Sequence, residues 1–154
     1  MKILVSACLL GLDCRYSATG HEDPRVMALI EKHDVVPACP EQLGGLPTPR
    51  SPAERLDGRV MNRKGMDVTA EFIKGAEETL KLARLFRCDA AILKSRSPSC
   101  GFGSIYDGTF TGRLTEGSGI TAERLCQAGL RVFAEDQWEQ WVDYEGGMTD
   151  GQCK

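Results

Sequence analysis

The sequence predicts a single α/β domain built on a mainly parallel, Rossmann-like sheet, with helices on both faces and two small hairpins. Short apolar runs at residues 3–7, 35–38, 90–93 and 130–134 indicate buried strands. Segments with helical signals separate these runs, and strands that alternate with helices form parallel sheets. The length of 154 residues suits one domain.

The first helix follows the first strand. Asp23 is a good N-cap and Pro24 suits the first helical position, so we expect a helix that ends near residue 32. Its inward side chains are predicted to be Val26, Met27 and Ile30. Pro37 weakens the strand predicted at 35–38, because proline cannot donate to a ladder. Residues 40–52 are too rich in proline and glycine to be regular.

The strongest helical pattern covers residues 69–86. Apolar side chains recur there at spacings of three and four, namely Phe72, Ile73, Ala76, Leu80 and Ala83. Asp-Gly pairs predict hairpins at residues 56–60 and 106–109, and residues 95–103 form a loop. Thr121 is predicted to cap a third helix that Gly129 ends.

The C-terminal part is predicted to hold one more helix, at residues 136–144, which packs Trp138 and Trp141. The domain then spans residues 1–147, and residues 148–154 form a flexible tail.

Composition and charge exclude several classes of protein. The chain is 42% hydrophobic and 27% charged, with a net charge of −3, which argues against a partner as anionic as a nucleic-acid backbone. It has no apolar run of about 18 residues, so we expect no membrane partner. The N-terminus becomes polar too soon for a signal peptide. We therefore expect a cytoplasmic protein, a monomer or a weak homo-oligomer.

Seven cysteines are the unusual feature of the composition. Their odd number and the expected reducing compartment argue against a disulfide framework. Cys88 precedes a strand and Cys126 lies within a helix, so both are expected to be buried and remote from any site. Cys153 lies in the tail and is expected to be inert.

Three cysteines follow the ends of predicted strands: Cys8, Cys39 and Cys100. Ligands of open parallel sheets bind beyond the carboxyl ends of the strands, so these thiols are expected to converge. Cys14 lies on the same loop as Cys8 and could reach the same place. From spacing alone, three unrelated loop cysteines are as good an interpretation.

The local sequence favours a metal site. Structural zinc sites use four ligands and a short Cys-x2-Cys pair, which is absent here. Three thiolates leave one metal position open, as a Lewis-acid catalyst requires. Around the cysteines stand one carboxylate, two hydroxyls and three glycines whose N–H groups could approach an anionic cofactor: Glu41, Ser97, Ser99, Gly44, Gly45 and Gly101.

Longer stretches carry a family resemblance. They are residues 6–11, 15–16, 39–54, 94–101 and 106–110, and the most specific are Cys39-Pro40-Glu41 and Ser97-Pro98-Ser99-Cys100-Gly101. Together they closely resemble the thiouracil desulfidase (TudS-like) family, once a group of unknown function, and the resemblance runs from residue 1 to about residue 134. The chain departs from the family after Arg15-Tyr16, where Ser17-Ala18 replaces the usual Asp-Gly.

The resemblance implies a [4Fe-4S] cluster held by only three cysteines, which correspond to Cys8, Cys39 and Cys100. It also implies non-redox removal of sulfur from a thiopyrimidine, a small-molecule substrate. Glu41 corresponds to the glutamate that positions the attacking water, and Ser97 or Ser99 to the serine that assists it. Gly44, Gly45 and Gly101 could donate N–H groups to cluster sulfurs and tune the iron.

Plainer interpretations stay open at this stage. Glu41 could cap a helix, and the two serines could be ordinary turn residues. The chain could be an iron–sulfur or metal-binding sensor, or a sulfur carrier, without hydrolytic turnover. It could also be a metal-free thiol oxidoreductase that uses Cys8 and Cys14.

Overall fold

The structure is a computed structural model that describes residues 1–139 and residue 153. Its centre is a four-stranded parallel sheet of β1 (Lys2–Ser6), β2 (Asp34–Ala38), β5 (Ala90–Leu93) and β8 (Arg131–Ala134). The strand order is β2-β1-β5-β8, so the order reverses between β1 and β5. The predicted mixed α/β fold with a parallel sheet is confirmed. Pro37 pairs with Val5 from the edge strand β2, where a missing donor is tolerated.

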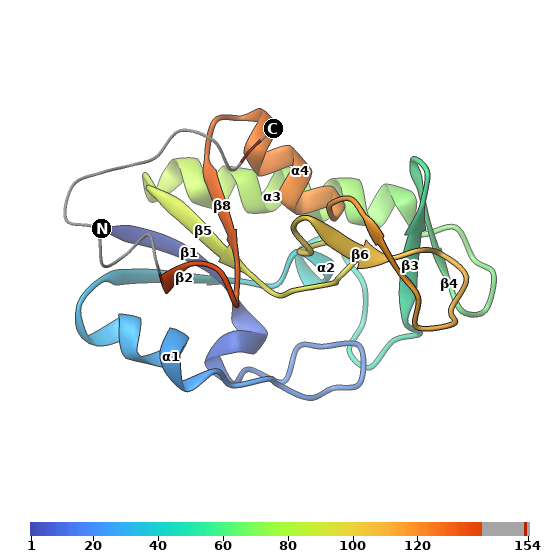
Figure 1. Ribbon diagram of the computed structural model, residues 1–154, viewed down its shortest axis with the longest axis horizontal. Helices are drawn as coiled ribbons and strands as arrows, with labels where there is room; N and C mark the ends of the chain where they lie inside the picture. Colours follow the sequence, from blue (N-terminus) through green and yellow to red (C-terminus); the bar gives the residue numbers. More distant parts are fainter. Residues whose placement is uncertain (140–152, 154) are drawn as a thin grey trace.

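Helices cover both faces of this sheet (Figure 1). The longest helix, α3 (Thr69–Leu85), and α4 (Ile120–Gln127) lie on one face, while α1 (Pro24–Met27) and a 3-10 turn (Ala28–Glu31) lie on the other. Successive strand residues alternate between the two cores, since Leu4 packs with the α3 and α4 side chains whereas Ile3 and Val5 pack with α1.

Two hairpins extend the molecule beyond the carboxyl ends of the strands, on the right of Figure 1. One joins β3 (Ala53–Leu56) to β4 (Arg59–Asn62), and the other joins β6 (Ser104–Tyr106) to β7 (Leu114–Glu116). The first turns at its predicted Asp-Gly pair, Asp57-Gly58. In the second, Asp107-Gly108 only begins a loop of residues 107–113, so this hairpin is wider than the predicted 106–109. A small core of Val60, Val68 and Phe72 packs the first hairpin against α3.

The first helix is shorter than the sequence predicts. Asp23 caps α1 as expected, since its Oδ1 accepts from Arg25 N at 2.9 Å. The α-helix ends at Met27, and the next four residues form a tighter 3-10 turn. Because that turn changes the period, Leu29 is buried and Ile30, predicted to face inward, is 52% exposed.

Helix α3 is confirmed, with one correction to its buried face. Ile73 is 49% exposed, and Gly75 and Thr79 are buried instead. The reason is a short helix, α2 (Pro40–Leu43), in a stretch that was predicted to be irregular. Pro40 suits the first turn of a helix, where its missing N–H is not needed. Helix α2 approaches α3 so closely that a Cβ on Gly75 would overlap the carbonyl oxygen of Pro40.

Helix α4 begins two residues earlier than predicted. Gly119, and not Thr121, is its N-cap. A Cβ on Gly119 would overlap the Ser99 carbonyl group, so the helix start can pack on that loop only with glycine here. The Thr121 hydroxyl instead shares a 2.9 Å hydrogen bond with Ser99 Oγ. Gly129 ends the helix in the left-handed region, at φ +87°, as predicted.

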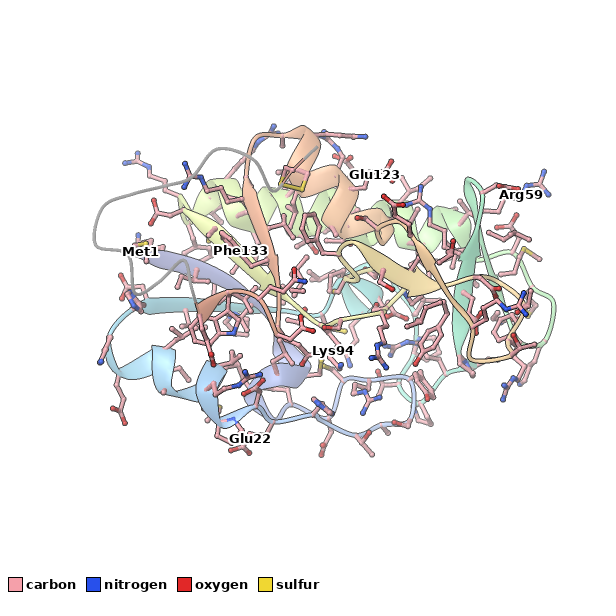
Figure 2. All side chains as sticks on the ribbon, viewed as in Figure 1. Met1, Glu22, Arg59, Lys94, Glu123 and Phe133 are labelled. Atoms are coloured by element: carbon pink, nitrogen blue, oxygen red, sulfur yellow. A yellow bond between two sulfur atoms is a disulfide. The ribbon has the colours of Figure 1, made fainter. Side chains whose placement is uncertain are left out.

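Two predictions for the C-terminal region are corrected. A disulfide joins Cys126 and Cys153, so Cys126 is not a free hydrophobic thiol and Cys153 is not unattached. It is the yellow bond near the top of Figure 2. Cys88 is only half-buried. Trp138 is buried as expected. Most of the predicted helix at 136–144, with Trp141, and most of the tail at 148–154 lie outside the described residues.

Among the helices of the described residues, none combines the length and the apolar character that crossing a membrane requires.

Candidate functional site

A cavity of about 730 Å³ lies beyond the carboxyl ends of the sheet strands. Its lining comes from the segments that follow β1, β2, β5 and β8 and from both hairpins. The strand order reverses between β1 and β5, which is where open parallel sheets bind their ligands. The position predicted for a site is therefore the position of this cavity.

All three cysteines predicted to converge line the cavity. Cys8 lies in the 3-10 turn that follows β1, Cys39 is the N-cap residue of α2 after β2, and Cys100 lies in the loop after β5. Cys8 and Cys100 are buried and Cys39 is partly buried, and none of the three is in a disulfide. The sheet therefore brings thiols that are 31 and 61 positions apart in the sequence to one place.

Cys14 lies among these thiols as well. It is buried, lines the cavity and interacts with the thiol groups of both Cys8 and Cys39. The Cys39 thiol also donates to the Cys14 carbonyl oxygen at 3.6 Å. The sequence left the place of Cys14 open, and the structure places its thiol beside those of Cys8 and Cys39 in the cavity.

The environment raises the pKa of three of these thiols, those of Cys14, Cys39 and Cys100. Burial raises the pKa of Cys100 to about 12, although hydrogen bonds with Ser6 and Ser99 oppose the shift. A hydrogen bond with Cys14, followed by burial, raises the pKa of Cys39. For Cys14 a hydrogen bond with Cys39 lowers the pKa, but one with Cys8, together with burial, outweighs it and raises the value to about 11. Metal ligands must be thiolates, so binding here would release protons.

The donor set suits an iron–sulfur cluster better than a single metal ion. Within residues 1–139 and 153, no three His, Cys, Asp or Glu side chains are placed to hold one metal ion. In an iron–sulfur cluster each iron is bound by its own cysteine, so the ligands stand around a larger group and do not meet at a point. Three soft thiolate donors from three loops around one cavity fit such a group.

Glu41 lies in the first turn of α2 and lines the cavity. Its Oε1 accepts from Arg50 Nε at 3.2 Å, and the two side chains are 19% and 6% exposed. Burial raises the pKa of Glu41, although the Arg50 charge opposes the shift. A carboxylate with a raised pKa beside a cavity suits proton transfer near neutral pH.

The two candidate serines have different surroundings. Ser97 lines the cavity, and its Oγ accepts from the backbone N–H groups of Ser99 and Cys100, both at 3.1 Å. Both bonds use the oxygen as acceptor, so the hydroxyl proton is available for a further partner. Ser99 is 1% exposed and its Oγ is paired with Thr121. Its hydroxyl thus joins the loop after β5 to α4.

The three glycines predicted to approach the cofactor have other partners. The N–H groups of Gly44, Gly45 and Gly101 donate to backbone carbonyls of Pro40, Gln42 and Ser97, at 2.8 to 3.0 Å. A Cβ on Gly44 would lie 2.9 Å from the carbonyl carbon of Glu71, so this glycine permits the contact between α2 and α3. The structure gives these glycines turn and packing roles, and it does not support N–H bonds to cluster sulfurs.

Sequence reasoning missed one buried ion pair in the cavity. Lys94 and Glu135 follow β5 and β8, and the Lys94 ammonium lies 2.5 Å from Glu135 Oε1, which also accepts from Ser95 N at 3.1 Å. Figure 2 labels Lys94 near the middle of the molecule. The rule that identified the cysteines, a polar side chain directly after a buried strand, applies to Glu135 too.

The loop in which the chain departs from the family lines the cavity only in part. Arg15 and Tyr16 line the cavity, whereas Ser17 and Ala18 do not. Ala18 adopts a left-handed conformation, with φ +60°, at the position where the family usually has glycine. Ser17 and Ala18 therefore belong to the turn and not to the cavity wall, and Ala18 holds a backbone conformation that glycine adopts at no steric cost.

The fold and the site together define an α/β protein with a thiol-lined cavity at the switch point of its parallel sheet. The chain belongs to the 2-thiouracil desulfurase family, whose model matches residues 3–137. It is similar to a solved structure of a [4Fe-4S]-dependent thiouracil desulfidase, TudS, with a TM-score of 0.86 and 45% identity over 92% of this chain and 95% of that chain. It is also 43% identical to the uncharacterized protein YbbK of Bacillus subtilis (strain 168) over 145 residues, which are 88% of this chain and 96% of YbbK.

Proposed function

We propose that this protein removes sulfur from a thiolated pyrimidine of the thiouracil type, without net redox change, at a [4Fe-4S] cluster held by Cys8, Cys39 and Cys100. The observation that carries the proposal is the convergence of these thiols and of Glu41 on one cavity. The family and the TudS structure, which is 45% identical, support the cofactor and the substrate class.

The overall chemistry replaces a thiocarbonyl with a carbonyl. Water adds its oxygen to the C=S carbon, the C–S bond breaks, and sulfur leaves as hydrosulfide. One of the two water protons ends on that hydrosulfide and the other is taken up by a base. When bound, a cluster with one iron that has no protein ligand supplies a Lewis acid for the sulfur atom.

Glu41 is the base in this proposal. Its burial raises its pKa toward the range in which a carboxylate can both accept and release a proton. It lines the same cavity as the three cysteines, so a water in that cavity can lie within reach of its carboxylate. The ion pair with Arg50 opposes that shift and so favours the ionised form, which is the form that takes the proton from water.

Ser97 is the better of the two serine candidates for holding that water. Its Oγ accepts two backbone N–H bonds, which fix the oxygen and direct its proton toward another acceptor. Ser99 is better suited to holding the Cys100 loop against α4 through Thr121. We place the protein in a reducing compartment such as the cytoplasm because the cavity thiols must stay free; the Cys126–Cys153 disulfide lies outside the cavity.

The test is anaerobic reconstitution followed by an iron count and a sulfide-release assay on a panel of thiopyrimidines. We expect about four irons per chain and one sulfide per oxo base formed. Serine in place of Cys8, Cys39 or Cys100 should lower iron and activity together, whereas Cys88→Ser, outside the cavity, is the matched control. Bound iron without sulfide release from any thiopyrimidine would favour a sensor or a carrier instead.

A further inference from the structure

Arg50 is a buried cation of the cavity lining that donates several hydrogen bonds. Its side chain is 6% exposed, and four of its contacts involve three different stretches of chain. Nε donates to Glu41, Nη1 donates to Pro47 O and Thr48 Oγ1, and Nη2 donates to Cys14 O, at distances of 2.9 to 3.2 Å. Few of its N–H groups remain to bind a substrate.

These contacts join the loop that holds Cys14 to helix α2. The Arg50 backbone N–H also donates to Tyr16 O at 2.9 Å, so residue 50 contacts the Cys14 loop through both its backbone and its side chain. The same guanidinium contacts Glu41 on α2. A planar fork of this kind fixes its partners more rigidly than a lysine ammonium does.

We propose that Arg50 is the positioning residue for Glu41. The inference rests on the proposed function, because it concerns the same carboxylate. The guanidinium binds Oε1 and is itself held by Cys14 O and Thr48. Within residues 1–139 and 153 no hydrogen bond is donated to Oε2, so that oxygen is the one that can take a proton from water.

Kinetics provide the first test. Arg50→Gln should lower kcat about 10- to 100-fold, the size expected for one charged hydrogen bond, with KM within about threefold and iron unchanged. In a Glu41→Gln background the same change should cost less than about threefold, because residues that act as a unit are not additive. Arg124→Gln, which breaks an ion pair between α4 and Glu77 of α3 outside the cavity, is the control.

The cluster-free protein provides the second test. Alkylation of Cys14 by iodoacetamide, mapped by mass spectrometry, should be about 10- to 100-fold faster in Arg50→Gln than in the wild type, since the bond to Cys14 O is lost. Arg50→Lys keeps the charge but loses the fork, so it should label almost as fast and retain more of the kcat. If Arg50→Gln does not fold, the comparison is made between Arg50→Lys and the wild type.

Three outcomes would overturn the proposal. One is an equal loss of kcat in the wild-type and Glu41→Gln backgrounds. Another is a raised KM with kcat unchanged, which would make Arg50 a binding residue. The third is unchanged alkylation in both Arg50 variants. If Glu41→Gln alone keeps the full rate, the role proposed for Glu41 fails, and the alkylation result still reports whether Arg50 joins the Cys14 loop to α2.

Discussion

Gly75 lies on α3, outside the cavity, yet it sets the position of the Cys39–Glu41 turn. A Cβ there would overlap Pro40 O and lie 2.8 Å from its carbonyl carbon, whereas ordinary contact begins at 3.4 Å. In Gly75→Ala the two helices must therefore separate by at least about 0.6 Å at that carbon and by more at the oxygen. Pro40 stands between Cys39 and Glu41, so both side chains must move.

The size of the effect follows from two opposed terms. Alanine improves helix propensity by about 1 kcal/mol, while overpacking a close contact costs about 1–3 kcal/mol. The free energy of unfolding should fall by about 0–2 kcal/mol, which corresponds to a fall in Tm of up to about 8 °C. A displacement of about 1 Å in a catalytic group can lower the rate about 100-fold. We therefore expect Gly75→Ala to lower kcat strongly while the protein stays folded.

The assay compares Gly75→Ala with Gly58→Ala, since Gly58 lies in a hairpin turn where a Cβ would meet nothing within 4 Å. Iron content, Tm and the rate of sulfide release are measured for both. We expect Gly58→Ala to match the wild type and Gly75→Ala to lose about 10- to 100-fold in rate. Equal rates in the two variants would refute the argument that the contact between α2 and α3 positions Glu41.

Three further predictions concern stability. Ala18→Gly should raise the unfolding free energy by about 0.5–1 kcal/mol, because φ +60° is strained for alanine; a thermal melt that does not rise would contradict this. In the cluster-free protein the pKa of Cys100 is raised from its ordinary value of 9.0 to about 12, so the protonated thiol stabilises the fold below pH 9. That stability is lost as the pH rises from 9 toward 12. Tm should therefore fall over this range, and it should fall less in Cys100→Ala. Lys94→Met should cost about 1–3 kcal/mol in denaturant melts by leaving Glu135 buried and unpaired, and Lys94→Met with Glu135→Gln should recover part of it.

Local rules predicted the sheet and the place of the site. Apolar runs identified all four strands of the parallel sheet, and the rule that ligands bind beyond strand ends predicted that Cys8, Cys39 and Cys100 share one cavity. Asp57-Gly58 forms the tight turn of its hairpin because its backbone preferences act over a few residues, whereas Asp107-Gly108 only begins the longer loop of the second hairpin. These features depend on short stretches of sequence, which is why they could be predicted.

Contacts between distant segments could not be predicted in the same way. Ile73 fits the helical pattern but is exposed, because α2 packs on Gly75 instead. Thr121 fits an N-cap, yet its hydroxyl binds Ser99, 22 positions earlier. The network of Arg50 with Cys14 and Glu41 depends on the folded arrangement of three loops, and no spacing in the sequence encodes it.

The most direct measurement of the central claim is iron content and sulfide-release rate in one preparation of Glu41→Gln. Glutamine keeps the shape of the side chain and removes no ligand, so iron should match the wild type. The rate should fall by about 100- to 10,000-fold, the usual contribution of a positioned general base. Normal iron with a normal rate would contradict the account, because Glu41 would then have no part in the chemical step.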